Sequence, residues 1–432
     1  MKFVLWRCLS LPFFLYLSSQ CSFAQTNASD LITQDDLFEK LYTLAVPDQE
    51  GVVVWPWLAS PVDFNADGKK DIILFGHHSS EAYIWYGAAN EAVLLQKEEW
   101  IFGALNPLWL DVDSDGDFDA IGNYGWGVEN NLFINRGGKF RKALRQFDYP
   151  IDDVDDAANW IEMPDHLSIS LHPLGAKFRE NFYVDLNNDG DDERVINFWG
   201  TDPEDASLYQ IHSWLLGKDG RKWTDITSRV GLPDGNTRIL FPDDFDVDGD
   251  IDLVDVHNGD LFINDQGDFT RAAQKLFTGN SPYNGDGSLQ VIDLDNNGYR
   301  DYVFGFDHDS SHGIFMNFSG HFNKLQGDII PGNRRLRRFA DLDDDGDLDM
   351  ISFNARDEIT VWRNKTGNPG AFVEYQGDLF GPTIRVEQDG KLIHYRQRIQ
   401  ESRMSRSNMY SHSIHVGGID PNREITVVAE EH

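Results

Sequence analysis

Short apolar runs, bounded by Gly, Asn and Asp, recur along the whole chain. Examples are Ile72-Ile-Leu-Phe75, Tyr302-Val-Phe304 and Met350-Ile-Ser-Phe353. Runs of this length with such boundaries are typical of β-strands and not of helices. No long amphipathic helix is predicted, because apolar residues do not recur at helical spacing over any long stretch. The pattern therefore predicts an all-β protein.

Many of these runs follow an acidic, glycine-centred loop of nine residues. The loops, named loops 1 to 6 in chain order, begin at Asp63, Asp111, Asp185, Asp244, Asp293 and Asp341. Their starts are 48, 74, 59, 49 and 48 residues apart, and position 2 of each loop is apolar. This period resembles the ~40–50 residues of known blade repeats, so we predict a β-propeller of four-stranded blades. The longer spacings indicate insertions, the larger at residues 149–171.

Six loops predict six blades, and a seventh stays open if residues 31–58 combine with the end of the repeat region. We predict that the propeller spans residues 51–375, and that residues 25–50 form a tether or a strand that closes the ring. The loops stop near residue 375, and Arg, His and Ser become more frequent. This change predicts a small β module over residues 376–432, with a hairpin at 383–398.

The first 24 residues have the pattern of a signal peptide. Lys2 and Arg7 precede an apolar run at 9–17, and small residues stand before Gln25. The alternative, lipid attachment at Cys21, is disfavoured because Gln20 stands where a small residue is required. The apolar run is shorter than the ~20 residues that a membrane-spanning helix needs. We therefore predict an exported protein, secreted, periplasmic or at the cell surface, that does not span the membrane.

Composition and charge point to bound cations. Both cysteines, Cys8 and Cys21, lie in the leader, so the mature chain has no disulfide and bound metal is the obvious substitute. Cleavage takes the formal charge from −35 to −37, because Lys2 and Arg7 are lost and no acid is. Six divalent ions would reduce this to about −25. A chain this acidic is not expected to bind nucleic acid.

Each loop offers the oxygen ligands that calcium prefers. Calcium takes six to eight oxygens, here from the side chains at positions 1, 3, 5 and 9 and the carbonyl at position 7, with Gly at position 6 for the sharp turn. Oxygen ligands without His or Cys favour calcium over zinc or copper. We predict up to six Ca²⁺ ions. The ligands, loop by loop, are Asp63, Asn65, Asp67, Lys69 and Asp71; Asp111, Asp113, Asp115, Asp117 and Asp119; Asp185, Asn187, Asp189, Asp191 and Glu193; Asp244, Asp246, Asp248, Asp250 and Asp252; Asp293, Asp295, Asn297, Tyr299 and Asp301; Asp341, Asp343, Asp345, Asp347 and Asp349.

Two other interpretations of the loops are less favoured. An EF-hand requires Glu at position 12, where Leu74, Gly122, Ile196, Asp255, Phe304 and Ser352 stand instead. Acidic turns without metal remain an alternative, because Asp, Asn and Gly are common turn residues. Six copies in register favour calcium, in a structural and not a catalytic role.

The loops resemble the FG-GAP/VCBS repeats of integrin-type β-propellers, in which a calcium loop joins the first two strands of each blade. The resemblance covers about residues 50–375, with departures at Glu193 and Asn297. The C-terminal stretch resembles the ASPIC/UnbV module of secreted proteins similar to cartilage acidic protein. The residues that carry this match are Gly381-Pro-Thr-Ile-Arg-Val386, Gly390, Gln397, Tyr410-Ser411, His415-Val-Gly-Gly418 and Glu424-Ile-Thr-Val427. The resemblance implies the fold but no particular activity.

Candidate ligand-binding residues fall on the face opposite the metal loops. If those loops join strands 1 and 2, the turns after strand 2 and the segments that lead into strand 1 share the other face. Aromatic and His side chains there suit sugars, and guanidinium groups suit carboxylate or sulfate. The candidates are His77, His78, Trp126, Trp199, His257 and His308 after strand 2, and Arg179, Arg238 and Arg335 six residues before loop position 1. The alternative is that the arginines pair with neighbouring carboxylates and the histidines are solvated.

The sequence favours a binding or adhesion module for a glycan, including an anionic one, or for an extracellular or periplasmic protein. The alternative is a polysaccharide lyase on the same scaffold, for which His77 or His78 would be the acid or base. No catalytic residue is assigned, because no GxSxG, HExxH or phosphate-loop motif occurs. Triplets of the form Asn-x-Ser/Thr at Asn27, Asn317 and Asn364 leave glycosylation open.

Overall fold

The computed structural model describes part of the 432-residue chain. The described residues are 13–17, 37–45, 56–58, 63, 67, 69–76, 82–87, 93–96, 108–110, 119–123, 130–136, 141–144, 178–201, 209–219, 222–232, 239–279, 288–305, 313–325, 336–343, 345–353, 358–366, 371–375, 383–396, 400–401, 413–420 and 423–430. Almost all of them lie in strands or in the turns between strands. The protein is all-β, as the sequence predicts. The insertion predicted at 149–171 lies outside the described residues.

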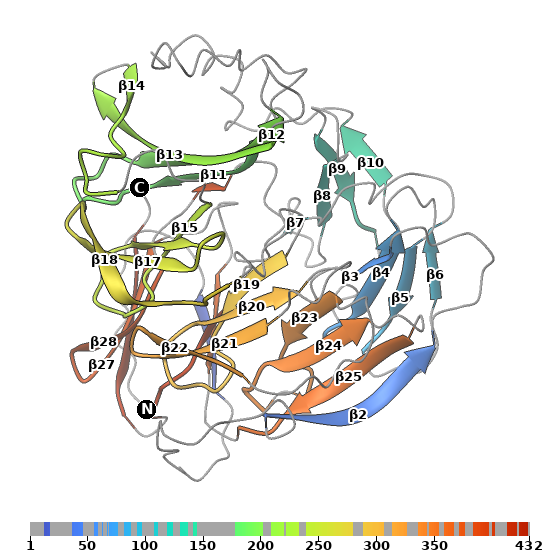
Figure 1. The fold of residues 1–432 in the computed structure, drawn as a ribbon. Helices are drawn as coiled ribbons and strands as arrows, with labels where there is room; N and C mark the ends of the chain where they lie inside the picture. Colours follow the sequence, from blue (N-terminus) through green and yellow to red (C-terminus); the bar gives the residue numbers. More distant parts are fainter. Residues whose placement is uncertain are drawn as a thin grey trace.

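Six antiparallel sheets follow one another around a common centre and make a β-propeller (Figure 1). Blade 1 has β3 (Pro56–Leu58), β4 (Ile72–Gly76), β5 (Ala82–Trp85) and β6 (Val93–Gln96). Blade 2 has β7 (Leu108–Leu110), β8 (Asp119–Asn123), β9 (Asn130–Ile134) and β10 (Arg141–Leu144). Blade 3 has β11 (Phe178–Val184), β12 (Glu193–Thr201), β13 (Tyr209–Asp219) and β14 (Lys222–Asp225).

The next two blades repeat this meander. Blade 4 has β15 (Leu240–Asp243), β16 (Asp252–Asp255), β17 (Asp260–Asp265) and β18 (Asp268–Lys275). Blade 5 has β19 (Ser288–Ile292), β20 (Asp301–Gly305), β21 (Gly313–Phe318) and β22 (His321–Lys324). In every blade, successive strands pair antiparallel, and the acidic loop joins the first strand to the second. The period of the sequence is therefore the period of the blades.

The sixth blade closes the ring with a strand from the N-terminal part of the chain. β23 (Leu336–Ala340), β24 (Asp349–Phe353) and β25 (Glu358–Asn364) supply three strands, and β2 (Phe38–Ala45) pairs antiparallel with β25 as the fourth. β2 lies within the stretch considered for a seventh blade, and β3 from the same stretch begins blade 1. Within the described residues the propeller therefore has six blades.

The C-terminal part of the chain forms two further sheets. β26 (Ala371–Tyr375) pairs with β30 (Ser413–Val416) and with β1 (Phe13–Leu17), and β27 (Thr383–Gln388) pairs with β28 (Lys391–Arg396) and β31 (Ile425–Glu430). The predicted hairpin is β27–β28, whose turn residues Asp389 and Gly390 both have positive φ. β29 (Gln400–Glu401) pairs with β11 of blade 3. β1 lies in the predicted leader, so the signal peptide stays a prediction.

Apolar side chains from neighbouring blades pack into shared cores. One cluster of buried residues joins blades 3, 4 and 5. In it the rings of Phe182 and Phe241 pack edge-on with their centroids 5.1 Å apart, as do those of Tyr302 and Phe322. In loops 3, 4 and 5 the apolar residue at position 2 is buried, because Leu186, Phe245 and Leu294 are at most 2 % exposed. Each of these three loops is thus anchored to a core by its second residue.

Candidate metal centre

The acidic loops share one hydrogen-bonded backbone, which is best seen in loop 4. The two carboxylate oxygens of Asp244, at position 1, accept the N–H groups of Asp248 at 3.2 Å and Gly249 at 3.2 Å. Asp248 Oδ1 in turn accepts the N–H of Asp250 at 2.9 Å. Gly249 has φ +100°, a conformation that only glycine adopts readily. The loop is therefore wound around the carboxylate at position 1.

The same bonds recur in the other described loops. The carboxylate at position 1 accepts the N–H of position 5 at 3.0–3.2 Å in loops 1, 3, 5 and 6. It also accepts the N–H of the glycine at position 6 at 2.8–3.0 Å in loops 3, 5 and 6. An aspartate at position 1 and a glycine at position 6 are thus required by the turn itself, and both lie where a bound cation would need them.

Position 9 carries the most deeply buried carboxylate of each of loops 3 to 6. Asp252 is fully buried, with Oδ2 accepting the N–H of Phe245 at 3.3 Å and Oδ1 accepting the N–H of Asn264 at 2.8 Å. Asp301 and Asp349 are also fully buried and make the equivalent bonds. Position 9 therefore links the start of its own loop to the end of the third strand of the blade.

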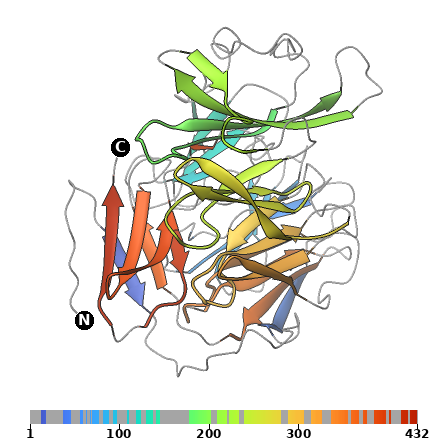
Figure 2. The same cartoon turned by 60° about the vertical axis from the view of Figure 1, so that its left-hand side comes forward.

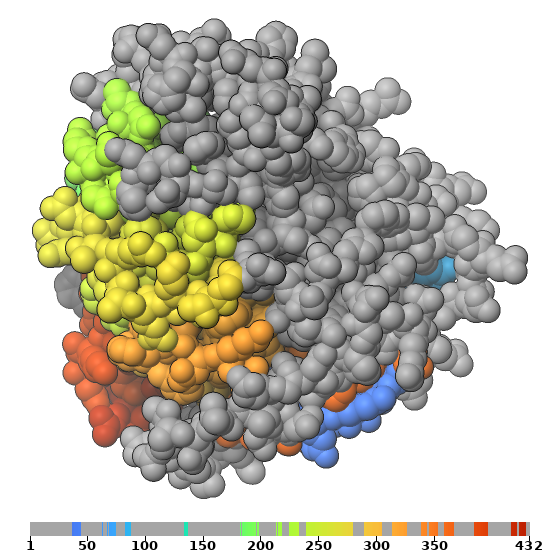
Figure 3. Space-filling model, in the orientation of Figure 1, coloured from blue at the N-terminus to red at the C-terminus, as the bar shows by residue number. Residues whose placement is uncertain are grey.

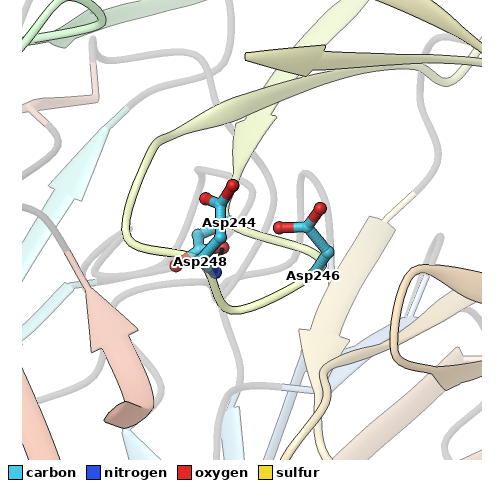
Figure 4. Close-up of side chains that lie close together, drawn as sticks. All are labelled: Asp244, Asp246 and Asp248. Atoms are coloured by element: carbon cyan, nitrogen blue, oxygen red, sulfur yellow. Dashed lines mark hydrogen bonds between the residues drawn. The ribbon is translucent and has the colours of Figure 1, made fainter. Parts of the chain in front are cut away.

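Three loops bring carboxylate oxygens within 4.8 Å of one another, close enough to hold one metal ion. The groups are Asp244, Asp246 and Asp248 in loop 4; Asp293, Asp295 and Asp301 in loop 5; and Asp341, Asp343 and Asp349 in loop 6. Figure 4 shows the loop 4 side chains gathered at one turn. Asp246 Oδ1 is buried without a hydrogen-bond partner among the described residues. An oxygen in that position fits a cation ligand.

Burial and mutual repulsion disfavour the charged forms of these carboxylates when no cation is bound. Burial raises the pKa of Asp252 to about 10, that of Asp349 to about 8 and that of Asp244 to about 7. The neighbouring loop carboxylates raise each pKa further, although the Arg300 guanidinium opposes the shift at Asp244. The pKa of Glu193 is raised to about 7, again mainly by burial. A divalent cation would offset this cost by stabilising the ionised forms.

An asparagine at the end of the third strand fastens each of three blades to the preceding one. Asn264 Nδ2 donates to the carbonyl of Leu186, at position 2 of the preceding loop, at 2.7 Å and to Ile251 of its own loop at 2.8 Å. Asn317 and Asn364 make the same pair of bonds, and all three are at most 2 % exposed. This role was not predicted from the sequence, although Asn recurs at the end of the third apolar run of several repeats.

The same hydrogen bonds exclude glycosylation of the folded protein at Asn317 and Asn364. The side-chain amides of Asn317 and Asn364 are buried and donate to carbonyls of the neighbouring loop. A glycan cannot be attached to either nitrogen in the folded protein, because the amide would have to leave the core. Asn27 lies outside the described residues.

Neighbouring loops also contact one another around the ring. Asn188, at position 4 of loop 3, donates to Asp250 Oδ1 at position 7 of loop 4 at 2.6 Å. Asn296 makes the equivalent bond to Asp347 Oδ1 at 2.6 Å. A third link is ionic, because Arg300 pairs with the buried carboxylate of Asp243. The side chains of Asp250 and Asp347, at position 7 of loops 4 and 6, thus face the preceding loop, and the predicted metal ligand at this position is the backbone carbonyl.

The structure describes most, but not all, of the predicted metal ligands. The residues at positions 1, 3, 5, 7 and 9 are described in loops 3, 4, 5 and 6. In loop 1, Asp63, Asp67, Lys69 and Asp71 are described and Asn65 is not. In loop 2, only the backbone of Asp119 is described, as the first residue of β8. Three carboxylates of the predicted set therefore come together in each of loops 4 to 6, and the complete ligand sets of all six loops stay predictions.

Few of the predicted ligand-binding residues can be located. Arg179 lies on β11 and Trp199 on β12, without described side chains. His77, His78, Trp126, Arg238, His308 and Arg335 lie outside the described residues. His257 is half-buried in the turn after β16, where its N–H donates to Asp255 Oδ1 at 2.9 Å. Ile239, which leads into β15, donates to the same oxygen at 3.2 Å, so these two segments share one edge as predicted.

No protein-family model matches the chain, and no curated protein has a matching sequence. Among the described residues, no helix combines the length and apolar character that crossing a membrane would require.

The solved structures that align with the chain include β-propeller proteins, all at low identity. A lectin from Agrocybe aegerita that recognises non-reducing terminal N-acetylglucosamine aligns with 88 % of this chain and 86 % of its own, at 15 % identity and a TM-score of 0.30. The V. cholerae biofilm matrix protein Bap1 aligns with 91 % and 64 %, at 13 % identity and a TM-score of 0.23. The exotype rhamnogalacturonan lyase YesX aligns with 72 % and 57 %, at 12 % identity and a TM-score of 0.25. Because these TM-scores are below 0.5, the propeller assignment rests on the sheets described above.

Proposed function

We propose that this chain is an exported, calcium-stabilised β-propeller that acts as a binding or adhesion module for a glycan or a protein partner. The observation that carries the calcium part is the gathering of carboxylates in three equivalent loops. Buried acids without a countercharge destabilise a fold, and here they recur at equivalent positions. A cation held by these loops gives the repetition a physical reason.

Calcium fits the donors better than other metals. Each loop supplies carboxylate and carbonyl oxygens, loops 1, 3 and 5 add the amide oxygen of an Asn, and no loop has His or Cys at a ligand position. The side chains at positions 1, 3, 5 and 9 and the carbonyl at position 7 would hold the ion, as in the FG-GAP/VCBS repeats that the loops resemble. Up to six ions would bind, and each would join the start of a loop to its end. Because Asn264, Asn317 and Asn364 tie adjacent loops together, a bound ion would stiffen the neighbouring blade as well.

Calcium removal tests this part directly. The protein with calcium should melt at a clearly higher temperature than the protein treated with chelator, because an ion that binds only the folded state stabilises it by about 2.7 kcal/mol at a concentration 100 times its Kd. Asp244→Asn should reduce the shift. Asp268→Asn, an exposed change on β18 of the same blade, should not. Identical melting curves with and without calcium would contradict calcium binding.

The binding role rests on a rigid ring that presents loops on two faces. One face carries the acidic loops, and the other carries the turns after strand 2, including the turn at His257. Loops at the end of a stiff scaffold are frequent binding sites. The predicted His, Trp and Arg residues of that face suit a sugar with carboxylate or sulfate groups. The signal peptide and the ASPIC/UnbV-like module, both predicted from the sequence, are consistent with an exported protein.

Screening the purified, calcium-loaded protein on an array of neutral and anionic glycans would test the ligand. We expect binding to anionic glycans that falls when Arg179, Arg238 and Arg335 are changed together to Glu. Ultraviolet absorbance of unsaturated products, abolished by His77→Ala or His78→Ala, would replace the binding role with that of a lyase. Absence of any glycan binding, with normal calcium-dependent melting, would leave a protein partner as the ligand class and exclude the glycan.

A further inference from the structure

The C-terminal module lies directly against the metal loops of blades 4 and 5. In Figure 2 its strands stand beside these blades, and in Figure 3 its red atoms adjoin the orange surface of blade 5. The contact centres on Gly417 and Gly418, which follow β30. The N–H of Gly418 donates to the carbonyl of Asn296, at position 4 of loop 5, at 2.7 Å. This bond joins the two parts of the chain at the turn of the loop itself.

Both glycines are required by the closeness of this contact. A Cβ atom on Gly417 would overlap Asp293 Oδ2, the position 1 carboxylate, and lie 2.5 Å from the Cα of Asn296. A Cβ atom on Gly418 would lie 3.0 Å from the Cα of Gly298, and Gly418 also has φ +69°. Backbone cannot move aside as a flexible side chain can, so only glycine fits at Gly417. The backbone of the module thus occupies space next to a predicted metal ligand.

β28 covers the same region from a second direction. The carbonyl oxygens of Ile393 and Gly417 each lie 3.8 Å from where a Cβ atom of Gly298 would stand. Leu392 packs against the core of blades 3 to 5, and its Cδ2 lies 3.7 Å from the corresponding point at Gly249 of loop 4. Tyr395 is 7 % exposed and belongs to that core. Apolar packing therefore holds the module over the loops.

Loop 5 differs from its neighbours in burial. Its carboxylates Asp293, Asp295 and Asp301 are 4 %, 6 % and 0 % exposed. In the other two described triads, one carboxylate is exposed, namely Asp248 in loop 4 and Asp343 in loop 6. The loop against which Gly417 and Gly418 pack is thus the one in which the whole triad is shielded from water.

We propose that the C-terminal module seals the loop 5 metal site, so that an ion there is exchanged only when residues 413–420 and β28 lift away from the propeller. This inference rests on the proposed calcium binding and goes beyond it. The release rate of an ion from an uncovered loop is set by its bonds to the ligands alone. An ion covered by residues 413–420 and β28, here called the cap, is released only after the cap opens locally, and each 1.4 kcal/mol needed for that opening slows release about tenfold. Conversely, an ion in loop 5 holds the surface on which the module docks.

Release of calcium from the full-length, calcium-loaded protein tests this. The protein is loaded with ⁴⁵Ca²⁺ and diluted into excess unlabelled calcium, and the retained label is followed over time. We expect one ion to leave at least about tenfold more slowly than the others, as for a site that opens only by local unfolding. Asp295→Asn should remove this slow ion and thereby assign it to loop 5.

Gly417→Ala places a methyl group against Asp293 and should bring the slow ion to the rate of the others. Lys391→Ala is the matched control, because Lys391 begins β28 of the same module and its side chain is exposed. Leu392→Ala should accelerate release through the other side of the cap, and it serves as the test if Gly417→Ala does not fold.

The outcomes separate the two proposals. Calcium that binds and leaves in a single phase would overturn the sealed site and leave the calcium scaffold intact. A slow phase that survives Asp295→Asn, or that persists in both Gly417→Ala and Leu392→Ala, would also overturn it. A protein that retains no calcium and melts identically without it would refute the calcium proposal itself.

Discussion

Replacing Asn317 with alanine tests whether the buried asparagines that join successive blades, Asn264, Asn317 and Asn364, stabilise the propeller. Asn317 Nδ2 donates to the carbonyl of Phe245 in the preceding loop at 2.7 Å and to that of Arg300 in its own loop at 3.1 Å. Its Oδ1 accepts the N–H of Gly320 at 2.9 Å. The side chain is fully buried, so water cannot replace these bonds without opening the core.

The cost of Asn317→Ala follows from these contacts. Three hydrogen bonds contribute about 1 kcal/mol each, and a buried group left without a partner costs about 1–3 kcal/mol. We therefore expect a loss of about 4 kcal/mol of unfolding free energy, which is large against the ~5–15 kcal/mol of typical domains. Because Phe245 belongs to loop 4, calcium affinity in that loop should fall as well.

Urea unfolding in excess calcium, followed by tryptophan fluorescence, measures this loss. Asn323→Ala is the matched control, since Asn323 lies on the next strand of the same blade with an exposed side chain. The control should change the midpoint little, as exposed substitutions usually do. A loss below about 1 kcal/mol for Asn317→Ala, or one equal to that of the control, would refute the role assigned to Asn317.

Three further predictions concern the same ring. In the folded protein the pKa of Asp252 is raised to about 10 and that of Asp349 to about 8, above the ~4 of an unfolded aspartate. The protonated carboxyl groups therefore stabilise the fold fully below about pH 4, and this stabilisation is lost as the pH rises through the folded-state pKa values. The urea midpoint of the metal-free protein should therefore fall between pH 5 and pH 9, and calcium should suppress the fall; a midpoint that rises without calcium would contradict this. Val247 has φ +60°, which strains a β-branched residue, so Val247→Asn should raise the free energy of unfolding by about 1 kcal/mol, whereas Val247→Ile should not. Tyr302→Phe removes the 2.6 Å bond to Asp243 and should lower stability by about 1–3 kcal/mol in the same assay; an unchanged midpoint would show that this bond is dispensable.

Much of the fold could be predicted from the sequence, because its determinants are local. Asp at position 1 and Gly at position 6 define each turn by bonds that span five residues, such as Gly298 N–H to Asp293 Oδ2 at 2.8 Å. Apolar runs of three or four residues, such as Tyr302-Val-Phe304 and Ile72-Ile-Leu-Phe75, suffice to specify strands, and their spacing predicts the blade period. The oxygen ligands follow for the same reason, since they all stand within nine consecutive residues.

Other features depend on contacts between distant parts of the chain. The pairing of β2 with β25 closes the ring over more than 300 residues of sequence separation, as in Thr43 opposite Thr360. The side-chain amide of Asn317 donates to the carbonyl of Phe245, which lies 72 residues earlier in the chain. The local sequence does not predict that Asn317 is buried, because its Asn-x-Ser triplet is also typical of a surface glycosylation site. These roles depend on which blade lies beside which.

By itself, the sequence determined an all-β chain, a blade period and six acidic loops with the oxygen ligands of a hard cation. Each of these features follows from interactions within one repeat, so the amino-acid sequence of a single repeat is enough to predict it. Only the tertiary structure decided that β2 completes the sixth blade, that buried asparagines join successive loops and that Gly417 covers Asp293. Those arrangements arise when surfaces from distant segments are buried against each other, and no local pattern specifies which segments will meet.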